Sequence, residues 1–390
     1  MTTKARPDIR SITRMVPRSG NLVQGQSELP INPLLAEAAT RRIAQSDNHY
    51  SPAEGVIELR RAVAKKISIF NGIQIDPEAT PLQLLITSGA TGALVAIAQT
   101  YLKGYTTLVF EPYYPYHRYI LDEFGAKTET LPLRGPELQL DRDELYRRCQ
   151  ELKALKNFPL RAIIACSPAN PTGRVFTQSE LEAIANICRE LDLLCIADEV
   201  YEHYVIGTVP HLSIASFPEM WERTITVNSF SKSWNISGWR LGYCFGDGGL
   251  IAPLNRVSNV FYVCTATPLQ KALSEVLMID PAYYDRLREN FKAKQQFATQ
   301  ALTEVGFDVY DSGSAFYLWA RIPEGYRDAT ELNQMLIEKA QVAAVPGSAF
   351  TDGDDWDSYL RVCIAREDEV LHGAIERIQS TVSAQRAAVT

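Results

Sequence analysis

RAIIACSP at residues 161–168, LLCIADE at 193–199 and TITVNSFSK at 224–232 are short apolar runs that each end in polar or turn-forming residues. Stretches with helical periodicity lie between them. Runs that are apolar on both faces are typical of parallel strands covered by helices on both sides of a sheet. Two earlier runs, LQLLITS at 82–88 and TTLVFEP at 106–112, repeat the pattern. We therefore expect an α/β fold.

The chain changes character after about residue 280. A long, charged amphipathic helix is predicted in YYDRLRENFKAKQQFATQAL at 283–302. Short strand-like runs follow in FDVYD, AFYLWARI and YLRVCIA, and a last helix is predicted to begin near Glu367. This pattern indicates a smaller α+β domain. We expect a large domain over residues 41–280 and a small domain formed by residues 1–40 and 281–390.

The composition limits the classes of partner. The 390 residues are 46% hydrophobic and 22% charged, with a net charge of -7, which argues against nucleic-acid or anionic-membrane partners. The basic N-terminus lacks the apolar stretch of a secretory signal, and no window is apolar for long enough to span a membrane. Seven scattered cysteines without a C-x-x-C motif are typical of reduced, buried thiols. We therefore expect a cytoplasmic protein.

The segment NSFSKSWNISGWRLGY at 228–243 places Lys232 directly after an apolar strand. A lysine at the end of a buried strand is costly unless it is paired, exposed or used chemically. When its pKa falls, the neutral amine attacks carbonyl groups. A solvated lysine on a loop is the alternative interpretation of this segment.

The segment CIADEVYEHY at 195–204 places Asp198 at the end of a wholly apolar run. Open α/β sheets bind ligands at the carboxyl ends of their strands, so this carboxylate could hold a protonated ring nitrogen. Tyr201 lies three residues further on and could present its hydroxyl to the same site. The alternative is an ordinary N-cap or turn aspartate.

Two further turns follow strand ends. In SPANPTG at 167–173, two prolines fix the backbone around Asn170 and present its amide rigidly. In TSGATGAL at 87–94, a helix start with Ser88 and Thr91 could cradle a phosphate, although neither the P-loop nor the G-x-G-x-x-G pattern is present. Each turn alone is equally compatible with a purely structural role.

Taken together and in this order, the four segments resemble the class I/II aminotransferases, a fold-type I pyridoxal-phosphate family. The segment SFSKSWNISGWRLGY resembles the family signature S-x-S-K-x(5)-G-x-R-x-G, and the resemblance covers roughly residues 20–380. It implies a large domain with a mainly parallel seven-stranded sheet sandwiched by helices, plus a smaller α+β domain. It also implies pyridoxal 5'-phosphate as cofactor and a homodimer with shared active sites.

The resemblance assigns expected roles to individual residues. Lys232 matches the lysine that carries the cofactor as a Schiff base, and Asp198 matches the partner of the pyridine nitrogen. The other expected cofactor contacts are Gly89, Ala90 and Thr91 at the phosphate turn, Ser229, Ser231 and Arg240 at the phosphate, Tyr114 stacked on the ring, Asn170 and Tyr201 at the phenolic oxygen, and Tyr50 reaching the partner subunit's cofactor. The expected substrate contacts are Arg361 at the α-carboxylate, Gly25 and Asn170.

The implied activity is transfer of an amino group between an L-amino acid and a 2-oxo acid, with the freed Lys232 amine as general base. Related β-eliminating C–S lyases, cyclopropane-forming synthases and amino-acid cyclases share the cofactor residues, so these alternatives stay open. A regulator that uses such a domain as a ligand sensor would need a DNA-binding region, for which the match leaves no room. No second arginine is identified for a dicarboxylate substrate, although Arg18, His117 and Arg118 are conceivable contacts. Four tyrosines near the expected site would suit aromatic or bulky substrates, with core or dimer-interface packing as the equal alternative: Tyr113, Tyr116, Tyr262 and Tyr317.

Overall fold

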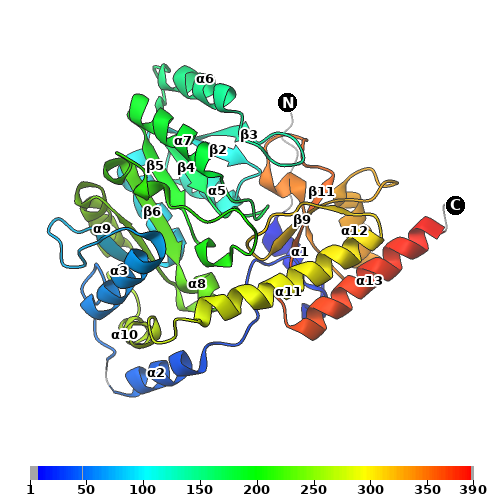
Figure 1. Cartoon of the computed structure of the whole chain (residues 1–390), viewed down its shortest axis with the longest axis horizontal. Coiled ribbons are helices and arrows are strands. Elements are labelled where there is room, and N and C mark those ends of the chain that lie inside the picture. Colours follow the sequence, from blue (N-terminus) through cyan, green and yellow to red (C-terminus); the bar gives the residue numbers. More distant parts are fainter. Residues whose placement is uncertain (1–7, 46, 388–390) are drawn as a thin grey trace.

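Two β-sheets organise the computed structural model, which describes residues 8–45 and 47–387 (Figure 1). The strands of the larger sheet are β1 (Leu84–Ser88), β2 (Thr106–Glu111), β3 (Lys127–Pro132), β4 (Leu160–Cys166), β5 (Leu194–Asp198), β6 (Thr224–Ser229) and β7 (Leu241–Gly246). Their order is β1-β7-β6-β5-β4-β2-β3. β7 is antiparallel to both of its neighbours, and the other pairs are parallel. The predicted mainly parallel seven-stranded sheet is confirmed.

Helices cover both faces of this sheet because successive side chains of a strand point to opposite faces. Leu85 packs on one face, whereas its neighbours Leu84 and Ile86 pack on the other. The first face carries α4 (Gly89–Ile97), α5 (Pro115–Glu123) and α9 (Gly248–Tyr262). On the second face lie α3 (Ile57–Asn71), α6 (Arg142–Lys153), α7 (Gln178–Glu190) and α10 (Thr267–Val276), and α2 (Pro33–Ala44) packs against α10.

The start of α7 shows how locally this chain encodes its helices. The Thr177 side chain accepts the N–H of Glu180 at 3.4 Å, and the Glu180 carboxylate accepts the N–H of Thr177 at 2.9 Å. This reciprocal arrangement is a capping box, which satisfies two amides that the first helical turn leaves without partners. The motif is visible in the sequence as T-x-x-E at 177–180.

A four-stranded sheet forms from the C-terminal part of the chain. Its order is β10-β11-β9-β8, from β8 (Asp308–Val309), β9 (Tyr317–Arg321), β10 (Val345–Pro346) and β11 (Tyr359–Cys363). The apolar side chains of this sheet pack against α11 (Tyr283–Glu304), α12 (Ala329–Ala340) and α13 (Asp368–Ala387). Leu22 of the N-terminal segment joins the same core and exchanges backbone hydrogen bonds with Ala343 and Cys363. The expected helix at 283–302 and the final helix are confirmed, whereas the exact domain limits stay a prediction.

Two further properties of the described chain bear on the expectations above. All seven cysteines are free thiols. Over residues 8–45 and 47–387, we find no helix with both the length and the apolar composition needed to cross a bilayer.

Candidate active site

The predicted site residues converge at one edge of the seven-stranded sheet. Asp198 ends β5, and Lys232 lies on the short helix α8 (Phe230–Ser233) that directly follows β6, the neighbouring strand. Asn170 follows β4, and Gly89 follows β1. The carboxyl ends of parallel strands meet at one edge, so these residues share it. Arg240 precedes β7, and the antiparallel direction of β7 brings it to the same edge.

Lys232 presents a partly buried amine whose pKa is lowered. Burial is the main cause and lowers the pKa of the amine to about 8. The charges of Arg240 and Arg361 also lower this pKa, whereas Cys363 and Asp198 raise it. The amine is therefore within electrostatic range of Asp198 and of two arginines. A lysine with this pKa exists partly in its neutral, nucleophilic form near neutral pH.

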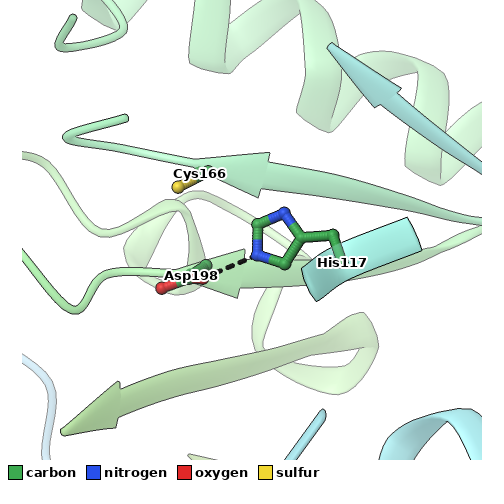
Figure 2. A group of neighbouring side chains, drawn as sticks. All are labelled: His117, Cys166 and Asp198. Atoms are coloured by element: carbon green, nitrogen blue, oxygen red, sulfur yellow. Dashed lines mark hydrogen bonds and ion pairs between the residues drawn. The ribbon is translucent and has the colours of Figure 1, made fainter. Parts of the chain in front are cut away.

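Asp198 is held by a partner that the sequence did not reveal. The Nε2 atom of His117 on α5 lies 2.7 Å from an Asp198 carboxylate oxygen, and both side chains are buried (Figure 2). Cys166 at the end of β4 lies beside them, and burial raises the pKa of its thiol well above the usual value, with the Asp198 charge acting in the same direction. In EPYYPYHRY, His117 stands three residues after Tyr114, which is about one helical turn. This spacing could have indicated that His117 lies at the same site as Tyr114.

Arg361 on β11 joins the small sheet to the site. Its Nη1 atom donates to the Asn170 side-chain oxygen at 2.8 Å, and Nη2 donates to the Val23 carbonyl at 2.5 Å. Its guanidinium lies over the rings of Tyr317 and Phe350, 4.5 and 4.9 Å from their centroids. The Nε donor is buried without a hydrogen-bond partner among the residues that the structure describes. An unsatisfied buried N–H is costly, so this atom is suited to a ligand oxygen.

Gly89 and Arg240 form a cradle at the start of α4. Gly89 adopts a φ of +65°, and a Cβ atom there would stand 2.4 Å from Arg240 Nη2. The N-cap residue Ser88 makes no side-chain capping bond, so the first-turn amides, including those of Ala90 and Thr91, are not capped by it. The positive end of a helix beside a guanidinium attracts an anion. The Oγ atoms of Ser229 and Ser231 lie 2.8 Å apart near the adjoining start of α8.

The predicted aromatic residues differ in their positions. Tyr114 occupies the N-cap position of α5 without a side-chain capping bond, and it packs edge-on against His117, with ring centroids 5.4 Å apart. Tyr201 is buried, and its oxygen lies 2.8 Å from that of Tyr317. Tyr50 alone among the predicted site residues lies apart from this cluster, with 85% of its surface exposed.

The N-terminal segment at residues 23–26 lies along the site and bends at Gln24, and its carbonyl groups are bound by cations. Lys232 Nζ donates to the carbonyl of Gly25 at 2.6 Å, and Arg361 donates to that of Val23. Arg366 donates to the other two carbonyls of the segment, at 2.8 and 3.2 Å. Three buried or partly buried cations thus share four consecutive backbone oxygens.

These residues fit pyridoxal phosphate. A partly buried amine of lowered pKa suits the aldehyde, and the buried Asp198 carboxylate suits a protonated ring nitrogen. The cradle of Gly89 and Arg240 suits the phosphate, and the unpartnered Nε of Arg361 suits a substrate carboxylate.

Comparison with known proteins agrees with this geometry. Residues 18–378 match the family described as aminotransferase class I and II, so the chain belongs to that family. It is 36% identical to the probable N-succinyldiaminopimelate aminotransferase DapC of Mycobacterium tuberculosis, over 94% of this chain and 93% of that protein. The solved structure of the M. tuberculosis N-succinyldiaminopimelate aminotransferase superimposes with a TM-score of 0.89, covering 96% of each chain.

A second kind of relative acts on other amino acids. The aromatic-amino-acid aminotransferase 2 of Thermococcus litoralis is 31% identical over 90% of this chain and 88% of its own length. The aromatic aminotransferase structure from Pyrococcus horikoshii is 30% identical with a TM-score of 0.86, covering 97% of this chain and 100% of that one. The chain is therefore a pyridoxal-phosphate-dependent aminotransferase of fold-type I, as the sequence predicted.

Proposed function

We propose that this aminotransferase binds pyridoxal phosphate covalently through Lys232 and the α-carboxylate of its amino acid through Arg361. The observation that carries the proposal is the lowered pKa of Lys232 at a sheet edge where Asp198 and Arg240 act on the same amine. The Lys232 nucleophile therefore lies within electrostatic range of Asp198, the carboxylate proposed for the ring nitrogen, and of Arg240, the cation proposed for the phosphate.

The residues of the chain supply binding and proton transfer. Bound pyridoxal phosphate supplies the sink for the electrons released when the amino acid loses its Cα proton. Lys232 in its neutral form accepts that proton. Asp198, oriented by His117, would present its carboxylate to the ring nitrogen of the bound cofactor, and Tyr201 and Asn170 would donate to its phenolic oxygen.

Arg361 selects the substrate carboxylate. A guanidinium can donate two parallel hydrogen bonds to a carboxylate, and the Nε of Arg361 has no acceptor in the described part of the chain. The guanidinium also lies over the rings of Tyr317 and Phe350, and these contacts restrict its position before the substrate arrives. Pre-orientation of this kind reduces the entropy lost on binding.

The proposed assembly is a homodimer in which Tyr50 serves the partner subunit's site. Its 85% exposure supports this, as do the exposed apolar side chains of Val260, Phe261 and Val263. The Thr267 hydroxyl donates to the carbonyl of His49, so the Tyr50 loop lies beside the start of α10, just after this apolar stretch. Exposed apolar groups that gather in one region are typical of subunit interfaces.

The free cysteines support the proposed cytoplasmic location.

Replacement of the lysine tests the proposal. Lys232→Ala should lose the visible absorbance of the covalent cofactor linkage, and turnover should fall by at least about a thousandfold because both the linkage and the general base are gone. Lys103→Ala, which changes an exposed lysine far from the cluster, should keep both properties. The measurements are an absorption spectrum after incubation with pyridoxal phosphate and a coupled transaminase assay.

A full absorption band in Lys232→Ala would show that another amine carries the cofactor. The wild-type enzyme, given an amino acid without a 2-oxo acid, should convert its cofactor to pyridoxamine phosphate. Ammonia and pyruvate as products would instead indicate the elimination chemistry of related lyases.

A further inference from the structure

Tyr201 and Tyr317 form a hydrogen-bonded pair that bridges the two sheets. Their oxygens lie 2.8 Å apart, and both side chains are buried. Tyr201 follows β5 of the large sheet, whereas Tyr317 is the first residue of β9 in the small sheet. Each hydroxyl carries one proton, so only one of the two can donate within the pair.

Tyr317 is fixed by contacts on three sides. Its ring lies under the Arg361 guanidinium, 4.5 Å from ring centroid to the central carbon. Its oxygen lies so close to the backbone of Gly25 that a Cβ atom there would stand 1.9 Å away. Its ring also packs edge-on against that of Tyr201. These contacts hold the Tyr317 oxygen beside that of Tyr201.

We propose that Tyr317 is a positioning residue that donates its hydroxyl proton to the Tyr201 oxygen and thereby directs the Tyr201 proton towards the cofactor. The inference rests on the proposed role of Tyr201 as a donor to the phenolic oxygen. A hydroxyl that accepts one hydrogen bond becomes a stronger donor in the next, because the chain of bonds is cooperative. Through its ring, Tyr317 also joins this donor to the guanidinium that binds the substrate.

Both hydroxyls stay protonated over the working pH range. Burial raises the pKa of Tyr201 well above its usual value and raises that of Tyr317 to about 12. The charged or ionisable groups that face the pair are Tyr114, Arg361, Cys363 and Arg366, and those that face Lys232 are Arg240, Arg361, Cys363 and Asp198. A titration of the covalent linkage therefore reports on the linkage and not on either tyrosine.

The test is a spectrophotometric pH titration of the Lys232–cofactor linkage in the holoenzyme. Negative charge on the phenolic oxygen stabilises the proton on the lysine-bound nitrogen, and donation by Tyr201 withdraws some of that charge. Tyr317→Phe should weaken the donation and raise the pKa of the linkage by roughly 0.3 to 1 unit, the range expected for one hydrogen bond. Tyr201→Phe should raise it further.

A double-mutant cycle separates this role from simple packing. In the Tyr201→Phe background, Tyr317→Phe should cause no additional shift, because the bond through which it acts is already absent. Tyr310→Phe, a half-buried tyrosine outside the cluster, should leave the titration unchanged. An unshifted titration in Tyr317→Phe, or an equal shift in both backgrounds, would overturn the inference. Failure of the wild-type enzyme to form the absorbing linkage would instead overturn the proposed function.

Discussion

The Lys232 amine owes its reactivity to its surroundings, and this makes cofactor attachment depend on pH. Only the neutral amine attacks an aldehyde, and its fraction grows as the pH rises through the pKa of about 8. The rate of attachment should therefore increase up to about pH 8 and then level off. Stopped-flow absorbance after mixing the cofactor-free enzyme with pyridoxal phosphate measures this rate. A rate that continued to rise towards pH 10 would show an unperturbed lysine.

Single residues were predictable where a motif surrounds them. Lys232, Arg240 and Asp198 stand in segments whose spacing is specific, and the structure brings them to one edge of the sheet. His117 and Tyr317 were named only as conceivable substrate contacts, because their partners lie 81 and 116 positions away in the chain. Pairings over such distances depend on how helices and sheets pack, which local pattern does not encode.

The capping box at the start of α7 is expected to contribute to stability and not to catalysis. Thr177→Ala removes one of the two capping-box bonds and should lower the free energy of unfolding by about 1 kcal/mol. Thr177→Asp, which restores an N-cap acceptor, should recover most of the loss. Urea unfolding measures the effect, and kcat should stay unchanged in both variants. A fall in kcat would mean that α7 influences the site.

Strands differ in how well the sequence predicted them. β1, β2, β4, β5 and β6 each contain a short apolar run, and these runs were recognised in the sequence. β3 at the sheet edge has exposed polar positions, so it lacks the apolar signal. β7 is fully buried but contains Gly242 and Gly246, which weaken a strand pattern. Gly242 is needed because a Cβ atom there would stand 2.6 Å from the backbone of Gly89.

At the scale of the whole molecule, the shared-site dimer predicts complementation between defective subunits. Tyr50→Phe should weaken cofactor binding roughly tenfold or more, since it removes a hydrogen bond to a charged phosphate. When Tyr50→Phe and Lys232→Ala subunits are mixed and exchanged, each hybrid dimer should contain one site with both native residues. About a quarter of all sites should then regain tight cofactor binding. Cofactor titration before and after subunit exchange measures the recovery.

The controls for this experiment are the two single variants, each as a homodimer taken through the same exchange procedure. Exchange within Tyr50→Phe alone should yield no tight sites, and Lys232→Ala alone should form no covalent linkage. If the mixed sample gained nothing beyond the average of its parents, Tyr50 would not act across the interface.

The two side chains proposed to bind substrate and cofactor, Arg361 and Lys232, already donate hydrogen bonds to backbone carbonyls of residues 23–26. A carboxylate that takes two parallel hydrogen bonds from Arg361 finds Nε open and Nη2 already bonded to the Val23 carbonyl at 2.5 Å, and Lys232 is bonded to the Gly25 carbonyl of the same segment. The backbone of residues 23–26 thus links Arg361 and Lys232 through its own oxygen atoms, and Arg366 binds the two carbonyls that remain.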